Sequence, residues 1–332
     1  MAVRKDKKSR GRGWKIAGIV LACVIALYVL VCLAGGYLFY PSFYGQAKKA
    51  APIPDMPAGF TPQGITWLEE EKTYLLCGYM PGGENSRIYV IPEGGEPRLV
   101  KLEREDRSAY TGHAGGITNA GDYVYISNAS KIFCLKKADL LAAKDGSAVA
   151  FEGYLPVPCR ASFISCDGKD LYVGEYHAEG YETEASHIVK TDSGEEYAAL
   201  VFAYALGEGP FGIAEPAAPR AAYAVPDFVQ GFAMTGDGRA VLSRSHGLAA
   251  SLIESYRPGS SPSGTFTDAA LSVPLYILDE KHRTATLRAP HMSEDCEVRG
   301  GELILAFEGG ARQYGAGLLP FSVTSVMTVP IP

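Results

Sequence analysis

Hydrophobic residues follow two different patterns along the chain. From Ile16 to Tyr40 no residue is charged, and about 20 apolar residues are enough for a helix to cross the hydrocarbon core of a bilayer. Beyond Phe60, Tyr and β-branched residues alternate with polar ones, and turn pairs such as Asp167-Gly168 separate the runs. Only the segment 136–146 has a helical period there. The pattern predicts one N-terminal transmembrane helix followed by an all-β domain.

The β-rich part contains five segments with one shared layout. In each, a small polar signature opens a strand, a turn follows, and a second strand ends in polar or small residues. The segments are PQGITWLEEEKTYLLCGYM (62–80), HAGGITNAGDYVYISNA (113–129), RASFISCDGKDLYVGEY (160–176), VQGFAMTGDGRAVLSRS (229–245) and SEDCEVRGGELILAFEG (293–309). Their first strands, counted from Gly64, Gly116, Ser162, Gly231 and Cys296, begin 46 to 69 residues apart, which is enough for the four strands of a propeller blade. We therefore predict a β-propeller of five blades.

A β-sandwich is the alternative fold, but it gives no reason for this layout to recur. Residues 205–228 and 257–270 are rich in Pro, Gly and Ala and are interpreted as loops. The last blade of a propeller is usually closed by a strand from the other end of the chain. Here 324–331 is a candidate late strand of the fifth blade, and residues 51–60 are its candidate partner.

Basic residues orient the predicted anchor. The first fifteen residues contain seven Lys and Arg and one Asp, and the positive-inside rule then places the N-terminus in the cytoplasm and the β domain outside the cell membrane. A cleaved signal peptide is the alternative, since small residues follow the apolar run, but this run exceeds the usual 7–15 residues. The predicted organisation is a cytoplasmic basic segment (1–15), a single-pass transmembrane helix (16–40), an extended tether (41–59) and the propeller (60–332).

Charge and cysteine content narrow the possible partners. Because the basic residues concentrate before the apolar run, the remaining chain is more acidic than the formal net charge of −6 implies. An acidic domain repels phosphate backbones, so we expect no nucleic-acid partner. Cys77, Cys134 and Cys296 lie in apolar runs typical of buried free thiols. A local disulfide between Cys159 and Cys166 is left open.

Candidate ligand-binding residues follow from the geometry of a propeller. The first strand of each blade lines the central channel, so residues that start the repeats should converge at one mouth. These are Gln63, His113, Arg160, Gln230 and Glu294, and the ends of the second strands add Glu175, Ser243, Ser245, His246 and Glu308. A ring of this kind can bind a small polar ligand or a cation.

Each candidate also has a structural interpretation. Gln63 and Gln230 can hydrogen-bond the backbones of neighbouring blades. His113, between glycines, can bond a loop carbonyl or face a ligand. Arg160 can pair with Glu175 or Glu294 inside the scaffold, or can hold an anionic group of a ligand.

Carboxylates are densest in the fifth unit. Glu294, Asp295, Glu297 and Glu308 suit Ca²⁺ or general acid/base chemistry. Alternate residues of a strand face opposite ways, so these four cannot all share one site. Glu294 and Glu308 are the candidates for a divalent cation, and catalytic residues are not assigned.

An ordered set of motifs resembles uncharacterised secreted or membrane-anchored bacterial β-propeller proteins. The motifs are TPQGIT, GYM, SRIYVI, YTGHAGGIT, YVYISN, RASFIS, YVGEYH, VPDFVQGFAMTGDGR, PLYILD and PHMSEDCEVRGGELILAFEGGARQY, and the resemblance covers about 55–316. More distantly, the blades are similar to those of gluconolactonase-like, NHL and YncE-like propellers. The lactonase resemblance implies a divalent cation held by Glu, Asn and Asp at the channel mouth. Glu294 or Glu308 is the counterpart in this sequence, and Asn and Asp partners are missing at equivalent positions.

Two hypotheses for function result. The first is a membrane-tethered binding or scaffold module that recognises a small polar ligand, a glycan or an envelope protein at the channel mouth. The second is a metal-assisted hydrolase or lyase with Glu294, Glu308 and His113 as metal ligands or acid/base groups. Divalent-cation binding separates the two.

Overall fold

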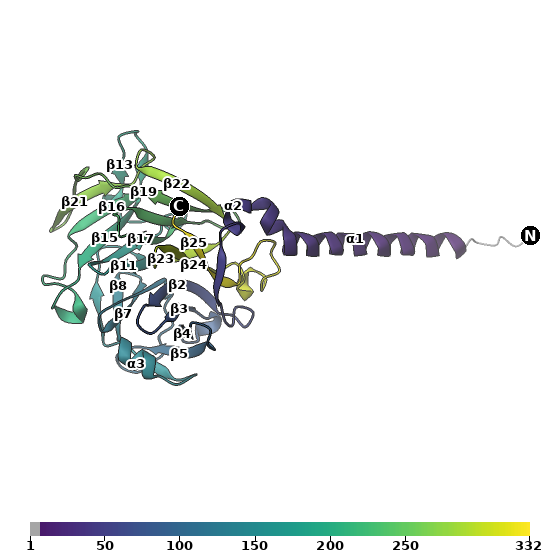
Figure 1. Ribbon diagram of the computed structural model, residues 1–332, viewed down its shortest axis with the longest axis horizontal. Helices are drawn as coiled ribbons and strands as arrows, with labels where there is room; N and C mark the ends of the chain where they lie inside the picture. The colour runs from purple at the N-terminus through teal and green to yellow at the C-terminus, as the bar shows by residue number, and fades with distance from the viewer. Residues whose placement is uncertain (1–6) are drawn as a thin grey trace, which may run out of the picture.

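The computed structural model describes residues 7–332 and confirms a five-bladed β-propeller preceded by one apolar helix. Figure 1 shows the blades arranged around a common centre, with helix α1 (Lys7–Phe39) leaving the rim of the ring. The five inner strands are β2, β6, β11, β17 and β23. Each contacts the next around the axis, and β11 also contacts β2 and β23 across it. The centre of the propeller is therefore narrow.

Blade one holds β2 (Thr61–Leu68), β3 (Thr73–Tyr79), β4 (Arg87–Pro92), β5 (Arg98–Glu103) and β9 (Ala148–Ala150). Blade two holds β6 (Gly116–Ala120), β7 (Tyr123–Asn128), β8 (Lys131–Lys136) and β10 (Gly153–Pro156). The expected short helix is α3 (Lys137–Ala142), which follows β8.

Blade three is the widest, with β11 (Ala161–Cys166), β12 (Asp170–Glu175), β15 (Ala199–Ala205), β16 (Ala221–Val225), β21 (Leu271–Ile277) and β20 (Gly264–Asp268). Its last two strands form a hairpin that lies, in the sequence, between the third and fourth strands of blade four and joins β16 in parallel. The two segments expected to be loops, 205–228 and 257–270, thus contribute strands β16 and β20. A separate pair, β13 (Val189–Lys190) and β14 (Glu196–Tyr197), lies in the β12–β15 connection.

Blade four holds β17 (Val229–Met234), β18 (Ala240–Arg244), β19 (Ser251–Tyr256) and β22 (Arg283–Ala289). Blade five holds β23 (Ser293–Arg299), β24 (Glu302–Phe307), β25 (Ser325–Pro330) and, from the other end of the chain, β1 (Lys48–Pro52). Strand β1 pairs antiparallel with β25 and so closes the ring.

This closure corrects the expected tether over 41–59. Helix α2 (Pro41–Tyr44) follows α1 directly, and Phe43 is fully buried against Phe307 of blade five, with ring centroids 6.0 Å apart. Met56 is also buried. The composition of this segment indicated an extended linker, but the open edge of β25 and the blade-five core give it a partner. The chain therefore passes from the apolar helix into the propeller without a flexible linker.

The hydrophobic core is divided into five clusters, each between two adjacent blades. Glycines in the inner strands let these blades approach closely. A Cβ added at Gly64 would lie 2.4 Å from the backbone N of Ile117, and one at Gly116 would lie 2.5 Å from the backbone N of Ile164. Such contacts are impossible without a backbone shift. The glycines of the PQGI and AGGI signatures are therefore packing requirements of the ring.

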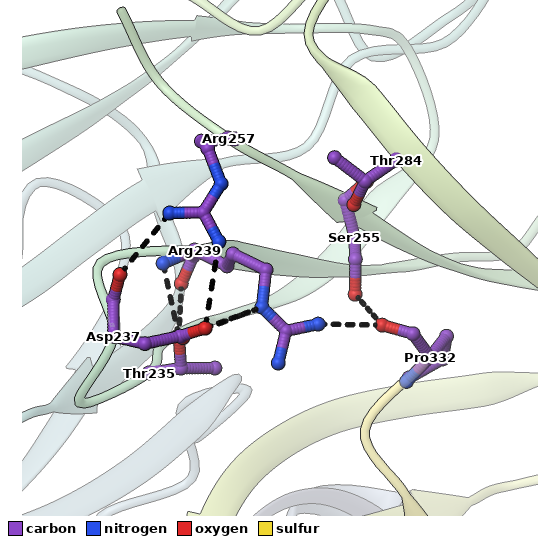
Figure 2. Close-up of polar contacts among 7 residues, drawn as sticks. All are labelled: Thr235, Asp237, Arg239, Ser255, Arg257, Thr284 and Pro332. Atoms are coloured by element: carbon purple, nitrogen blue, oxygen red, sulfur yellow. Dashed lines mark hydrogen bonds and ion pairs between the residues drawn. The ribbon is translucent and has the colours of Figure 1, made fainter. Parts of the chain in front are cut away.

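All seven cysteines are free, including Cys159 and Cys166. The end of the chain is fixed to blade four (Figure 2): the carbonyl of Pro332 accepts hydrogen bonds from Arg239 Nη1 at 2.8 Å and from Ser255 Oγ at 2.6 Å. Asp237 contacts Thr235, Arg239 and Arg257 beside it, and its bonds to Thr235 and Arg239 lower its pKa to about 2. This charged cluster lies on the β17–β18 turn and has a structural role.

Candidate functional site at the mouth of the propeller

Four of the five inner hairpins carry a β-bulge at the same end of the propeller axis. The pairing register shifts between Pro62 and Gly64, Ala161 and Phe163, Val229 and Gly231, and Ser293 and Cys296. The residues inside these bulges are Gln63, Ser162, Gln230, and Glu294 with Asp295. A bulge releases a residue from the ladder and re-aims its side chain, and bulges are frequent beside functional sites. We call this end the mouth and the opposite end, where the inner hairpins turn, the base.

Two carboxyl groups lie together at the mouth. Glu294 on β23 is only 3% exposed, and Glu308, directly after β24, is half-buried. Gln63 Nε2 donates to Glu308 Oε2 at 3.1 Å. Glu294 Oε1 is buried without a hydrogen-bond partner, and among residues 7–332 no Lys, Arg or His forms an ion pair with either carboxyl. The pair is thus an uncompensated acidic group inside the protein.

Burial sets the protonation of this pair. Desolvation raises the pKa of Glu294 well above its ordinary value, and the neighbouring Glu308 raises it further. Desolvation also raises the pKa of Glu308 to about 7, although hydrogen bonds with Tyr314, Glu294 and Gln63 oppose this rise. Two carboxyl groups this close titrate as a unit, since like charges disfavour double ionisation. At neutral pH the pair therefore retains at least one proton.

Three tyrosines surround the carboxyl pair, each from a different blade. Tyr79 ends β3, Tyr176 follows β12, and Tyr314 lies in the turn after β24. Desolvation raises the pKa of each phenol, and the charges of Glu294 and Glu308 raise it further. Tyr314 also hydrogen-bonds Glu308, and Tyr79 and Tyr176 lie within electrostatic range of the pair.

Two histidines extend the aromatic surface at the rim. His113 stacks on Tyr79 with ring centroids 4.7 Å apart, and His246 stacks on Phe228 at the same distance. His246 Nδ1 also lies 2.8 Å from the hydroxyl of Tyr176. Desolvation lowers the pKa of His113, so its ring is neutral at pH 7. Neither histidine forms an ion pair with Glu294 or Glu308 in the described part of the chain.

A second carboxylate site lies at the base and differs from the mouth. Glu297 accepts hydrogen bonds from Thr66 Oγ1 at 2.6 Å, Thr118 Oγ1 at 3.0 Å and the backbone N of Trp67 at 3.1 Å. Its donors come from blades one and two, so it joins three blades around the axis. Desolvation still raises its pKa to about 7.

Asp295 lies between the two ends and is 1% exposed. One oxygen accepts from the backbone N of Cys296 at 3.0 Å, and the other is buried without a partner. Desolvation raises the pKa of this carboxyl well above its ordinary value, and nearby backbone N–H groups only partly offset the rise.

The structure brings together some of the residues predicted from sequence. Gln63, Glu294 and Glu308 meet at the mouth, His113 lies at its rim, and Gln230 occupies the blade-four bulge. These residues could be identified because they start or end the repeated segments of the sequence.

Three other candidates take structural positions. Glu175 is fully buried and bonds His187 Nδ1 at 2.7 Å and the backbone N of Leu200 at 3.1 Å. Ser243 is buried with its Oγ 2.8 Å from the Oγ of Ser293. Arg160 is exposed and donates to the carbonyl of Glu182 at 3.2 Å, so it pairs with neither Glu175 nor Glu294.

The three tyrosines near the carboxyl pair were not among the residues predicted from sequence. Tyr176 directly follows Glu175, and successive residues of a strand face opposite sides. Because β12 runs antiparallel to β11 and ends at the mouth, Tyr176 lies there as well. Tyr79 ends its blade's second strand in the same way, so aligning the GY and EY ends of the repeats would have identified both.

The donor set does not resemble a metal centre. Within the described residues, no group of three or more His, Cys, Asp or Glu side chains is arranged to hold a metal ion. Beside Glu294 and Glu308, the third polar neighbour is Gln63, which presents its N–H to Glu308. The Asn and Asp ligands implied by the lactonase resemblance have no counterpart here.

A search of protein-family models and of curated protein sequences found no match. Solved structures similar in fold include a pyrroloquinoline-quinone-bound aldose sugar dehydrogenase from Streptomyces coelicolor, at 14% identity over 86% of this chain and 97% of that chain, with a TM-score of 0.47. A putative glucose dehydrogenase from Thermus thermophilus matches at 12% identity over 86% of this chain and 99% of that chain, with a TM-score of 0.42. Hydrazine synthase from Kuenenia stuttgartiensis matches at 12% identity over 76% of this chain, with a TM-score of 0.36, and this chain spans 56% of its length. At these identities and TM-scores, none of the three identifies an activity for this chain.

Proposed function

We propose that this chain is a membrane-anchored binding propeller whose mouth takes a small organic cation, a protonated amine or a quaternary ammonium group. The observation that carries the proposal is the carboxyl pair of Glu294 and Glu308, which has no cationic partner and is surrounded by tyrosines. Recognition of quaternary ammonium groups by aromatic side chains is a common use of cation–π attraction.

The anchor part of the proposal rests on α1. Its segment Gly13–Cys32 has a mean hydropathy of 2.6 and none of it is buried by the propeller. A 20-residue helix rises about 30 Å, which matches the hydrocarbon core. The basic residues before it favour a cytoplasmic N-terminus and a propeller outside the cell. A signal sequence passes the same hydropathy test, but β1 and α2 continue directly from this helix into the fold.

The ligand class follows from charge and from the aromatic walls. An anionic ligand would be repelled by the pair, because neither Arg160 nor a histidine compensates it. A neutral polyol can bond the carboxyls but does not relieve their mutual repulsion. A cation next to Glu308, which is the more exposed of the two, favours the ionised form and gains contact with phenol faces. Binding should therefore release a proton.

The test uses the full chain in detergent micelles and choline as the probe. Isothermal titration should detect binding of choline and no binding of 3,3-dimethyl-1-butanol, its uncharged analogue. Glu308→Gln should weaken choline binding by about 10- to 100-fold, since removing one charge near a partly buried cation loses roughly 1.5–3 kcal/mol of Coulombic attraction. Affinity should rise roughly tenfold from pH 6 to pH 8, as the proton on the pair is lost.

The matched control is Glu297→Gln, a buried carboxylate of the same strand at the base, which should leave choline affinity unchanged. Equal binding of choline and its uncharged analogue would contradict the proposal. So would stabilisation by Ca²⁺ or Zn²⁺ that Glu308→Gln abolishes, which would favour the metal-assisted enzyme instead.

A further inference from the structure

A loop of blade five lies along the apolar helix. This loop, residues 315–321 and hereafter the blade-five loop, lies between β24 and β25. The hydroxyl of Tyr28 donates to the carbonyl of Leu318, and Cys32 Sγ lies 4.0 Å from the same carbonyl. Phe321 packs on Phe39, with ring centroids 5.2 Å apart. The loop thus runs beside the last turns of the helix for several residues.

Glycines in the helix make room for this contact. A Cβ at Gly35 would lie 2.7 Å from Phe321 Cε1, and one at Gly36 would lie 2.8 Å from the ring of Tyr44. The Gly35-Gly36 pair therefore lets two aromatic rings dock on α1. Because helical glycine costs roughly 0.5–1 kcal/mol relative to alanine, its presence at both positions fits a packing role.

The position of the loop relative to the apolar segment is the central observation. The segment able to span a membrane ends at Cys32, and Tyr28 lies four residues before this end. At 1.5 Å per residue, the tip of the loop reaches roughly 6 Å inside the segment. Groups that insert in the boundary between headgroups and acyl chains lie about 5–10 Å deep.

The composition of the loop suits that depth. The sequence GAGLLPF contains no charged side chain. Leu318 is 69% exposed, although it is a large apolar residue. The propeller therefore leaves this apolar side chain uncovered beside the helix.

We propose that the blade-five loop inserts into the outer leaflet beside α1, as a second membrane contact of the propeller. The inference rests on the proposed anchor and adds a fixed orientation to it. Helix α2 contacts β22, and Phe43 packs on Phe307, so blades four and five face the lipid surface. Insertion of the loop would prevent the propeller from swinging about the end of the helix.

The loop also connects the membrane to the mouth. Tyr314, which bonds Glu308, lies directly before it, and His291 Nε2 lies 2.9 Å from the carbonyl of Pro320. A change in the depth of the loop in the membrane would therefore be transmitted to Glu308 through Tyr314.

The test places a tryptophan at the loop tip in the full chain. Trp14 and Trp67 are the native tryptophans, so Leu318→Trp is made with Trp14→Phe to remove the helix signal. Tyr154→Trp in the same background is the control, because Tyr154 is also exposed, at 44%, on β10 of blade two, which is not one of the two blades that face the lipid. Both proteins are reconstituted in phosphatidylcholine vesicles with and without doxyl-labelled lipid. Neither substitution removes a buried contact.

The loop tryptophan should emit at shorter wavelength, and doxyl lipid should reduce its emission about twofold, since an interfacial side chain lies beside the labelled chains. The control tryptophan should be unaffected by labelled lipid. Equal quenching in the two variants would overturn the insertion of the loop while leaving the anchor intact. Failure of the wild-type chain to float with the vesicles would overturn the anchor and the insertion together.

Discussion

Glu294 at the mouth and Glu297 at the base lie three residues apart on β23, about 10 Å at the rise of a strand. Both are nearly inaccessible and both have a raised pKa because of desolvation. At the base, three donors from neighbouring blades satisfy the carboxylate. At the mouth, Glu294 lies next to a second carboxyl group, that of Glu308, and its Oε1 has no hydrogen-bond partner.

The difference separates a structural carboxylate from a functional one. A raised pKa alone does not distinguish them, since burial produces it at both ends. An oxygen without a partner does not distinguish them either, since Glu175 and Asp295 also have one. What sets the mouth apart is that two carboxyl groups lie together there without a cationic partner, whereas donors from two other blades hold Glu297. The base holds blades one, two and five together, and the mouth is the end at which we propose that a ligand binds.

The largest expected effect comes from truncating the base carboxylate. Glu297→Ala should lower the free energy of unfolding by about 2–4 kcal/mol, because Thr66, Thr118 and the Trp67 N–H lose a buried acceptor. Glu294→Ala should lower it by less than about 1 kcal/mol, since it also removes a repulsive partner of Glu308. Urea unfolding in detergent, followed through Trp67 in a Trp14→Phe background, measures both. Equal losses of stability at the two ends would show that Glu294 and Glu297 have the same structural role.

The next effect is the pH dependence of stability. The pKa values of Glu297 and Glu308 rise from 4.5 to about 7 on folding, so the native state binds more protons than the unfolded chain between these pH values. Their stabilising contribution is complete below pH 4.5 and is lost as the pH rises through 7. Unfolding free energy should therefore fall by about 2–3 kcal/mol for each of the two groups from pH 5 to pH 8, since each unit of pKa shift corresponds to roughly 1.4 kcal/mol.

Variants assign that pH dependence to the two ends. The double variant Glu294→Gln with Glu308→Gln should flatten the profile more than Glu297→Gln does, because two coupled groups titrate at the mouth and one at the base. A profile that rises with pH, or one unchanged by the double variant, would show that the mouth carboxyls are ionised in the native state at all these pH values.

Much of the fold was predictable because the blade repeats. The constant layout of five units located the inner hairpins, and the glycine signatures marked where inner strands approach. Strand β1 was not predictable from its own residues, since KKAAP lacks β-branched and aromatic side chains. It becomes a strand because β25 offers an open edge, which is a tertiary effect.

Residues of the candidate site could be predicted where their position in the repeat determines their location. They could not be predicted where the direction of the side chain determines it. Gln63, Glu294 and Glu308 followed from position alone. Glu175 did not, because it lies one residue before the end of its unit and faces the interblade core with His187. The satisfaction of Glu297 also could not be predicted, since it depends on threonines of two other blades facing the axis at one height.

The smallest effect concerns the one donor that the mouth does possess. Gln63 Nε2 bonds Glu308 and holds its pKa below the value that burial alone would give. Gln63→Met keeps the length of the side chain and removes the donor. The titration of the pair should then move upward by up to about half a pH unit, and stability at pH 8 should fall by less than about 1 kcal/mol.

Asn119→Leu is the matched change at the base, because Asn119 donates to Thr66 at 2.9 Å and not to Glu297 itself. It should lower stability by a similar amount without moving the titration of Glu297. If both variants move the pH profile equally, then desolvation and not direct hydrogen bonding controls the protonation at the two ends, and the mouth differs from the base only in exposure.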